Sequence, residues 1–364
     1  MTDIDYMKTA FRLALRAKGE TSPNPLVGAL IVRGHRIVAE GWHQYCGADH
    51  AEVMALEKAG KKAKGATLYV TLEPCSHFGR TPPCVDPIIA CGIHEVVVGM
   101  KDPNPVNNGK SLMMLKRAGI KVRVGFLEEP LKEMNEAFIK YITKKLPFVV
   151  AKCAQTLDGK IATASGQSQW ITSPSSRDYA HALRKDFDAI LVGINTVLKD
   201  DPFLNAPGKR KPIKKVVVDT HLQIPMNASV FKDTDPSNVM IAITAKAKKT
   251  KIQLLRQKGV CVLMGPEFHG GVQLKWLLRE LAKREITNLL IEGGGRIIGG
   301  ALREDLVDKF LIFMAPKIVG DERALGSVSG LRVRHVEELV RLYHVRVERM
   351  GEDILIEGYV HRNR

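Results

Sequence analysis

His50-Ala-Glu52 and the later stretch Thr71-Leu-Glu-Pro-Cys-Ser-His-Phe-Gly-Arg-Thr-Pro-Pro-Cys84 decide the fold and the chemistry of the first half of this chain. Together they supply one imidazole, two thiols and a carboxylate. A catalytic zinc is held by three protein ligands and a water, whereas a structural zinc is normally closed by four protein ligands. The carboxylate two residues after the histidine suits a proton shuttle rather than a ligand. We therefore predict a zinc site at His50, Cys75 and Cys84, with Glu52 as the catalytic acid and base.

Each of these residues has a simpler explanation when it is taken alone. Asp49 and Glu52 could begin a helix as an N-cap and its N3 partner, and Cys75 and Cys84 could be packed thiols. The combination favours the zinc site, where bound metal would make hydroxide available at neutral pH and Glu52 would move protons. The expected reaction replaces an amine by a carbonyl and releases ammonia.

The spacing of the two thiols is unusual for such a site. Zinc deaminases commonly carry Cys-x-x-Cys, whereas the eight residues Ser76-His-Phe-Gly-Arg-Thr-Pro-Pro83 separate the cysteines here. A loop of this length is also able to line a substrate pocket. His77 within the loop is a competing ligand candidate, while Cys46 and Cys91 are expected to be packing residues.

Length and composition indicate the class of protein. A chain of 364 residues that is 45% hydrophobic and 26% charged is typical of a globular protein with two domains. No apolar run approaches the roughly 18 residues of a membrane span, and the acidic start argues against a secretory signal. Six cysteines scattered through a long chain are typical of the reducing cytoplasm. The sequence thus predicts a cytoplasmic protein without a membrane partner.

The formal net charge of +16 indicates either a solvated basic surface or anionic partners. Lys and Arg are spread along the chain, and the densest patch is Lys209-Arg-Lys-Pro-Ile-Lys-Lys215. No basic stripe is interleaved with aromatic residues, so phosphorylated small molecules explain the charge at least as well as RNA does.

Apolar periodicity predicts alternating helices and strands in the first half. The expected helices cover residues 5–18, 50–59, 111–118 and 131–143, with a short helix between Cys84 and Gly92. The expected strands cover residues 26–32, 36–39, 66–71 and 94–99. This alternation predicts an α/β layered domain.

A change of character near Lys144-Lys-Leu-Pro147 predicts a boundary that divides the chain into domains 1–146 and 147–364. The second half again alternates between strands and helices. Its expected strands cover residues 148–154, 189–193, 215–219, 239–243, 260–264, 287–292 and 309–314. Asp158-Gly159 predicts a hairpin near the start of this second domain.

Longer motifs resemble those of one family. The segments that carry the resemblance, besides the two quoted first, are Ser22-Pro-Asn-Pro-Leu-Val-Gly28, Gly41-Trp-His43, Lys101-Asp-Pro-Asn-Pro105, Ala151-Lys-Cys-Ala-Gln-Thr-Leu-Asp-Gly-Lys-Ile-Ala162, Ser168-Gln-Trp-Ile-Thr172, Asn195-Thr196 to Asp201-Pro202 and Ile291-Glu-Gly-Gly294. They resemble the bifunctional riboflavin-biosynthesis deaminase/reductase over nearly the whole chain. The long loop between the cysteines is specific to this branch of the zinc deaminases.

The resemblance implies an α/β chain with a cytidine-deaminase-like three-layer domain followed by a dihydrofolate-reductase-like domain. It implies that the first domain uses Zn²⁺ to deaminate a diaminohydroxyphosphoribosylaminopyrimidine. The second domain would then use NADPH to reduce the ribosyl group of the aminouracil product to ribityl phosphate. The partners expected are therefore phosphorylated pyrimidine substrates and no nucleic acid, and a homo-oligomer is expected as well.

The resemblance also assigns binding residues. Those expected to contact substrate are Asn24, His43, Lys152, Ser168, Arg184, Leu204 and Glu292. Those expected to contact NADPH are Ala154, Trp170, Thr196, Asp200, Thr220, Gly294, Gly295, Arg296, Gly299 and Gly300. Without the resemblance, Asn24 suits a turn between two prolines and Trp170 suits a core position. Lys152 lies among apolar strand residues, where an unpaired ammonium is costly and an anionic partner would remove the cost.

The glycine-rich run in the second half supplies a strand, a turn and a helix start. Backbone N–H groups at such a helix start are able to approach a phosphate. The run is not a Rossmann fingerprint, because Ile298 stands at the place of the third glycine. Its residues alone are equally consistent with a tight turn.

One departure from the family bears on the reductase. The family usually continues the Asp-Pro motif, after one variable residue, into Leu-Thr-x-Arg, whereas this chain has Asp201-Pro-Phe-Leu-Asn-Ala-Pro207. Lys209 or Arg210 from the adjacent loop is a candidate replacement for the missing arginine. The missing arginine motivates one alternative, an active deaminase with a weakened or inactive reductase domain. The charge and the zinc motif motivate another, a nucleic-acid deaminase that acts on tRNA.

Overall fold

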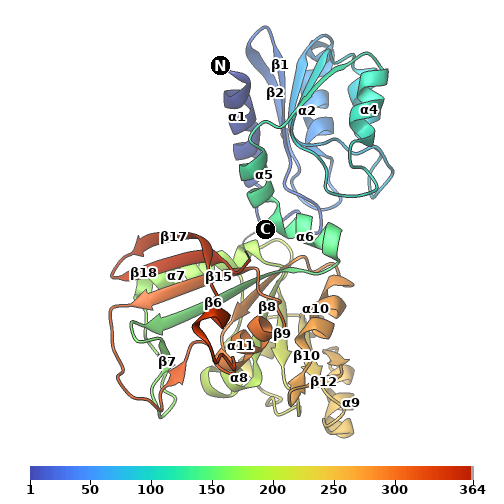
Figure 1. Cartoon of the computed structure of the whole chain (residues 1–364). Coiled ribbons are helices and arrows are strands. Elements are labelled where there is room, and N and C mark those ends of the chain that lie inside the picture. Colours follow the sequence, from blue (N-terminus) through green and yellow to red (C-terminus); the bar gives the residue numbers. More distant parts are fainter. Residues whose placement is uncertain (362–364) are drawn as a thin grey trace. The chain divides into compact units, whose positions relative to one another are not determined.

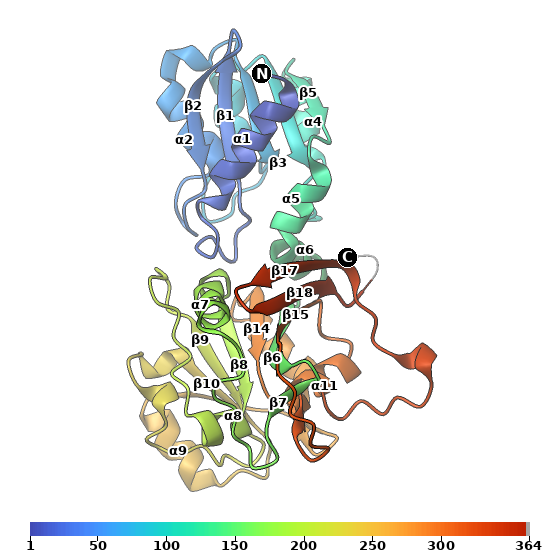
Figure 2. The ribbon, with the colours of Figure 1, turned by 90° about the vertical axis from the view of Figure 1, so that its left-hand side faces the viewer.

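The computed structural model describes residues 1–361, and the chain divides into two compact units, Met1–Leu146 and Pro147–Arg364. Each unit has its own mixed sheet with helices packed on it (Figures 1 and 2). The expected α/β class is therefore confirmed for both halves. Among the residues described, no helix is long and apolar enough to cross a membrane.

The first unit is built on a five-stranded sheet of order β2-β1-β3-β4-β5. The strands are β1 (Gly28–Arg33), β2 (Arg36–Trp42), β3 (Thr67–Leu72), β4 (Glu95–Met100) and β5 (Lys121–Val124). The helices are α1 (Asp3–Leu15), α2 (Ala51–Ala59), α3 (Val85–Ala90), α4 (Lys110–Arg117), α5 (Glu128–Met134) and α6 (Glu136–Lys144). Figure 1 shows α1 and α5 on one side of the sheet and α2 and α4 on the other, which gives three layers.

A close contact between β2 and α2 sets the position of the helix that follows His50. A Cβ atom added at Gly41 of β2 would lie 2.2 Å from the carbonyl oxygen of Ala51, so only glycine allows this approach. The start of α2 is thereby held against the sheet. The sheet thus determines where the His50 side chain lies.

The single helix expected over residues 131–143 is wrong, because the structure has two helices, α5 and α6, that meet at Asn135. The buried Asn135 side chain accepts from the N–H of Leu26 at 2.8 Å and donates to its carbonyl oxygen at 3.1 Å. This long-range pairing holds Asn135 outside regular helix geometry. The short strand β5 was not expected from the sequence.

The second unit is built on a nine-stranded sheet of order β11-β10-β9-β8-β14-β6-β15-β18-β17. These strands are β6 (Phe148–Thr156), β8 (Ala189–Gly193), β9 (Lys214–Val218), β10 (Val239–Ile243), β11 (Cys261–Met264), β14 (Asn288–Glu292), β15 (Lys309–Ala315), β17 (Tyr343–Met350) and β18 (Asp353–Tyr359). The helices are α7 (Pro174–Leu183), α8 (Ile194–Asp200), α9 (Lys249–Gln257), α10 (Leu274–Ala282) and α11 (Gly295–Arg303). All pairings are parallel except β15 with β18 and β18 with β17.

The prediction of a hairpin at Asp158-Gly159 is wrong, because the strand after the turn pairs with a distant strand. The chain does turn there, since the N–H of Gly159 donates to the carbonyl oxygen of Thr156 at 3.0 Å. The strand after the turn, β7 (Lys160–Ala162), pairs instead with the distant β16 (Leu325–Gly326). A short hairpin of β12 (Glu267–Phe268) and β13 (Gly271–Val272) and the C-terminal pair β17–β18 were also not expected.

Candidate active sites

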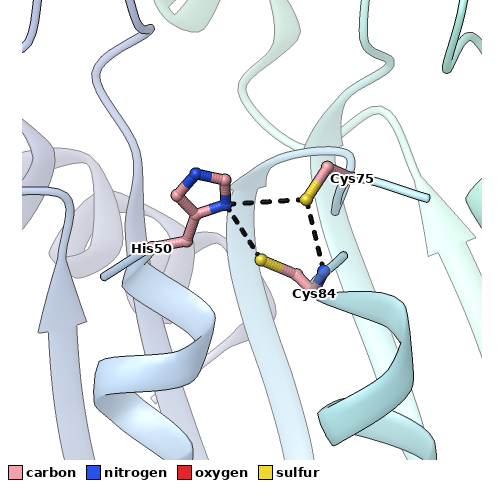
Figure 3. A group of neighbouring side chains, drawn as sticks. All are labelled: His50, Cys75 and Cys84. Carbon is pink, nitrogen blue, oxygen red and sulfur yellow. Dashed lines mark hydrogen bonds between the residues drawn. The ribbon is translucent and has the colours of Figure 1, made fainter. Parts of the chain in front are cut away.

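His50, Cys75 and Cys84 converge in the first unit (Figure 3). His50 immediately precedes α2, Cys84 immediately precedes α3, and Cys75 lies in irregular chain after β3. The Nδ1 atom of His50 is 3.0 Å from the Sγ atom of Cys84 and 3.5 Å from that of Cys75. One imidazole nitrogen and two sulfurs within 4.8 Å of one another fit a zinc ion with three protein ligands.

Neighbouring groups orient these three side chains. The outer ring nitrogen of His50, Nε2, lies 3.1 Å from the hydroxyl of Thr81, so that Nδ1 faces the sulfurs. A polar partner on the outer nitrogen is typical of a metal-binding histidine. The backbone N–H of Cys84 donates to the sulfur of Cys75 at 3.2 Å. A donor at the start of α3 favours the thiolate form that binds metal.

The pKa values of the two thiols are shifted in opposite directions. Hydrogen bonds from Cys84 and from His50 hold the pKa of Cys75 well below its ordinary value. The neighbouring Cys75 sulfur and burial raise the pKa of Cys84. The pKa of His50 is raised, chiefly because its ring binds Cys75. Cys75 is therefore the sulfur that carries negative charge most readily.

Glu52 lies in the first turn of α2 and only 3% of it is exposed. Burial raises the pKa of this carboxyl to about 7, against the opposing charge of His50. A group that is partly protonated at neutral pH is suited to both accepting and donating a proton. The capping interpretation of Asp49 and Glu52 is wrong, because His50 occupies the N-cap position and Glu52 is buried.

Asn24 and His43 lie beside the cluster. The Asn24 side-chain amide donates to His43 Nε2 at 3.0 Å, and His43 Nδ1 lies 3.1 Å from the carbonyl oxygen of Asp49. This pairing fits a neutral ring that carries its proton on Nδ1, and burial lowers the pKa of His43 in agreement. The ring meets that of His50 edge to face with centroids 5.4 Å apart. The structure thus brings both predicted substrate residues to the cluster.

Three other candidates from the sequence fall outside the cluster. His77 is not among the grouped ligand atoms, and its Nδ1 is buried with no hydrogen-bond partner among the described residues. Cys91 packs against the core as expected. Cys46 is half-buried and its sulfur contacts the Arg80 guanidinium instead, which links the long loop to the segment before His50.

The second unit contains a cavity of about 1650 Å³. It is lined by all but one of the residues predicted for the reductase: Lys152, Ala154, Ser168, Trp170, Arg184, Thr196, Asp200, Leu204, Thr220, Glu292, Gly294, Gly295, Arg296 and Gly300. Gly299 does not line it. A Cβ atom at Gly299 would lie 1.9 Å from the carbonyl oxygen of Ser329, so this glycine is explained by packing of α11 against residues 326–330.

Charged side chains meet on one wall of this cavity. Arg184 binds both oxygens of Glu292, at 2.8 and 2.7 Å. Lys152 of β6 is paired in register with Glu292 of β14, and its ammonium lies 5.5 Å from the centre of the Phe313 ring. Because Arg184 already occupies Glu292, the Lys152 charge is available to an anionic or hydroxylated ligand.

The glycine-rich turn before α11 has the shape of a phosphate cradle. Gly293 and Gly294 have positive φ angles of 105° and 82°, which side chains rarely adopt. A Cβ atom at Gly295 would lie 2.4 Å from the carbonyl oxygen of Gly326. Bare backbone at a helix start, facing a large cavity, fits the pyrophosphate of a dinucleotide.

Further polar and aromatic groups complete the wall. The Ser168 hydroxyl donates to Asp200 at 2.7 Å, which joins a predicted substrate residue to a predicted cofactor residue. Trp170 is 64% exposed, so the core interpretation of this residue is wrong. The Arg177 guanidinium lies 4.5 Å from its ring centre. A large exposed ring on a cavity wall is available for stacking with a ligand.

Pro207 lines the cavity at the place of the missing arginine, but neither proposed replacement does. The Lys209 ammonium donates to the carbonyl oxygen of Lys185 at 2.7 Å. Other basic residues line the cavity without having been predicted: Arg177, His181, Lys199, His221, His269 and Arg303. Nothing in their local sequence distinguishes them, because the fold gathers them from separate segments.

Comparison with known proteins agrees with this architecture. The family model described as the cytidine and deoxycytidylate deaminase zinc-binding region matches residues 1–100, and the RibD C-terminal domain matches residues 147–356. The riboflavin biosynthesis protein RibD of Aquifex aeolicus is 46% identical over 97% of both chains. That of Escherichia coli is 40% identical over 91% of this chain and 92% of its own.

Solved structures give the same result. A structure of Acinetobacter baumannii RibD covers 98% of both chains with 34% identity and a TM-score of 0.89. A Thermotoga maritima structure, described as a diaminohydroxyphosphoribosylaminopyrimidine deaminase/5-amino-6-(5-phosphoribosylamino)uracil reductase, covers 98% of both with 38% identity and a TM-score of 0.85. Fold and sites therefore define a two-domain enzyme with a deaminase-type and a reductase-type half. The chain belongs to the RibD family of riboflavin biosynthesis proteins.

Proposed function

We propose that residues 1–146 form a zinc-dependent pyrimidine deaminase and residues 147–364 an NADPH-dependent reductase, which catalyse two consecutive steps of riboflavin synthesis. The observation that carries the proposal is the cluster of one imidazole and two thiols, with the buried carboxylate of Glu52 on the helix that begins beside it. The proposed substrate is the diaminohydroxyphosphoribosylaminopyrimidine named for the Thermotoga relative. Its phosphate agrees with the net charge of +16.

In the deaminase, His50, Cys75 and Cys84 would hold zinc, which when bound lowers the pKa of water toward neutrality. The Glu52 carboxylate would take a proton from the attacking water and pass it to a ring nitrogen. A proton delivered to the leaving amine then releases ammonia and leaves a carbonyl. The neutral His43 ring would hold the Asn24 amide in place against the pyrimidine.

In the reductase, NADPH when bound supplies a hydride for the first carbon of the ribosyl group, while the ring C–O bond at that carbon breaks and the released oxygen takes a proton to become a hydroxyl. The side chains proposed to bind substrate are Lys152, Ser168, Arg184, Leu204 and Glu292. The residues proposed to bind NADPH are Ala154, Trp170, Thr196, Asp200, Thr220, Gly294, Gly295, Arg296 and Gly300. Glu292, oriented by Arg184, and Lys152 would bind the sugar hydroxyls, and the glycine turn would bind cofactor phosphates.

A coupled assay on the purified full-length chain tests both halves. With the pyrimidine substrate and NADPH, we expect ammonia release first and NADPH oxidation only after deaminated product has formed. Failure to release ammonia from zinc-loaded protein would overturn the deaminase assignment. Failure to oxidise NADPH with preformed deaminated product would overturn the reductase assignment. The cytoplasmic location and the homo-oligomer stay predictions, the former supported by six free cysteines.

A further inference from the structure

The chain around Cys75 is irregular, unlike the chain around the other two proposed ligands. His50 and Cys84 each adjoin the start of a helix, whereas residues 73–83 contain no helix or strand. A functional side chain keeps its place to within about 0.5 Å only when surrounding groups lock it. Some other part of the unit must therefore fix the backbone of Cys75.

The side chain of Asn107 holds the peptide groups on both sides of Cys75. Its Nδ2 atom donates to the carbonyl oxygen of Pro74 at 3.0 Å and to Asp102 Oδ2 at 3.1 Å. Its Oδ1 atom accepts from the backbone N–H of Ser76 at 2.9 Å and from the Ser76 hydroxyl at 2.6 Å. Asn107 is 0% exposed and its bonds to Pro74 and Asp102 are buried, so losing those bonds leaves buried polar groups without a partner, which is costly.

Glu73 anchors the loop that carries Asn107. Its carboxylate accepts from the N–H of Gly109 at 2.9 Å, from the hydroxyl of Ser111 at 2.7 Å and from the N–H of Asp102 at 3.2 Å. Glu73 is 3% exposed and Ser111 is 0% exposed. Residues 102–111 thus contribute no atom to the ligand cluster, yet they bind the chain both before and after Cys75.

We propose that Asn107 is a positioning residue that places the sulfur of Cys75 against His50 and Cys84 and thereby sets the affinity of the deaminase unit for zinc. The inference rests on the proposed zinc site. On its other side, Cys75 is tied to the start of α3, since Val85 N–H donates to its carbonyl oxygen and Cys84 N–H to its sulfur, both at 3.2 Å. Without Asn107, the sulfur keeps this second attachment and its contact with His50 Nδ1, but the two peptide groups beside Cys75 lose the side chain that fixes them.

The test compares Asn107→Leu, which keeps the side-chain size and removes all four hydrogen bonds, with Asn108→Leu, the same change at the exposed neighbour. Competition with a chromophoric chelator measures the zinc affinity of each full-length protein. We expect zinc to bind about 10- to 100-fold more weakly to the Asn107 variant, the usual effect of losing support around a metal ligand. The Asn108 variant should stay within about twofold of the unmodified protein.

A second measurement separates positioning from general stability. A purely structural role would lower the melting temperature of zinc-free and zinc-loaded protein equally, whereas positioning predicts that the rise in melting temperature on adding zinc shrinks. Should Asn107→Leu not fold, Ser76→Ala removes a single bond, and we expect about a two- to tenfold loss of zinc affinity. The absorption spectrum of Co²⁺-loaded protein should shift in the same variant.

The outcomes distinguish this inference from the proposed function. Unchanged zinc affinity and an unchanged cobalt spectrum in a folded Asn107 variant, or in Ser76→Ala where that is the variant that folds, would overturn the positioning role. Unmodified protein that binds no zinc would instead overturn the proposed deaminase site.

Discussion

Arg184 and Glu292, which lie 108 residues apart in the sequence, form two parallel hydrogen bonds of 2.8 Å (Nε to Oε1) and 2.7 Å (Nη2 to Oε2). Their side chains are only 13% and 8% exposed. Burial acts to raise the pKa of Glu292, but the hydrogen bonds and charge of Arg184 outweigh it, so the pKa lies below its usual value. The pair therefore places a carboxylate that is ionised at neutral pH on the wall of the reductase cavity.

Removing Arg184 should destabilise the second unit in a pH-dependent way. Arg184→Met removes both hydrogen bonds from a buried carboxylate and leaves Lys152 as a neighbouring positive charge, which costs up to about 3–5 kcal/mol at neutral pH. Burial then raises the folded pKa of Glu292 above its unfolded value, so the deficit shrinks as pH falls toward about 4.3. In the unmodified protein the folded pKa of Glu292 is lowered, so the ionised carboxylate stabilises the fold. That stabilisation is lost only as the pH falls below the unfolded pKa of about 4.3.

Urea unfolding of both proteins at pH 7 and pH 5 measures this difference. The double variant Arg184→Met/Glu292→Gln removes the charge and should recover part of the stability at pH 7. An equal deficit at the two pH values would contradict the assignment of the effect to Glu292.

Glu52→Gln should abolish proton transfer while leaving the ligand cluster in place. We expect ammonia release to fall about 100- to 10,000-fold, because an amide neither accepts nor returns the proton. Zinc content measured by elemental analysis should stay the same. Reduction of preformed deaminated product serves as the internal control, since Glu52 belongs to the other unit. Undiminished ammonia release would rule out the shuttle role.

Zinc removal should separate the two activities. Dialysis against a strong chelator is expected to stop deamination, because the three proposed ligands belong to the first unit only. NADPH oxidation with the deaminated substrate should continue, and added Zn²⁺ should restore ammonia release. Parallel loss of both activities would show that the metal acts on more than the proposed site.

Two neighbouring glycines of α11 should respond differently to the same substitution. Gly299→Ala places a methyl group 1.9 Å from the carbonyl oxygen of Ser329, so residues 326–330 must move and the melting temperature should fall. Gly300→Ala meets nothing closer than Leu274 Cδ1 at 3.4 Å. It should be neutral or stabilising by up to about 1 kcal/mol, the usual gain within a helix. Similar melting temperatures for the two variants would argue against the packing role of Gly299.

Pro207→Arg should strengthen binding of the phosphorylated substrate to the reductase. Position 207 lines the cavity, and a guanidinium there would add a charge-assisted contact of about 1.5–3 kcal/mol. We expect the KM for deaminated substrate to fall about tenfold or more, whereas Pro207→Gln, without the charge, should not lower it comparably. A KM that does not respond to the arginine would indicate that other basic residues already bind the phosphate.

The alternation of strands and helices was predictable because the helices space their apolar residues at a helical period, whereas the buried parallel strands are short, continuous apolar runs. The strands over 189–193 and 239–243 were predicted to the residue. The partner of β7 was not predictable. Asp158-Gly159 specifies a turn, but it carries no information on residues 325–326, which pair with the strand that follows the turn. The break at Asn135 likewise depends on hydrogen bonds to Leu26, 109 residues away.

The sequence by itself determined which residue types are available to the predicted zinc site, because one imidazole and two thiols are ligands that zinc commonly takes, and it determined most of the helices and strands beside them. Only the tertiary structure decided how these side chains are supported and which distant groups join them. Asn107 binds the peptide groups on both sides of Cys75, the Thr81 hydroxyl contacts the outer ring nitrogen of His50, and Arg184 lowers the pKa of Glu292. The physical reason is that local periodicity and turn chemistry act over a few residues, whereas burial, charge pairing and hydrogen bonds between loops exist only after the sheets have brought separate segments together.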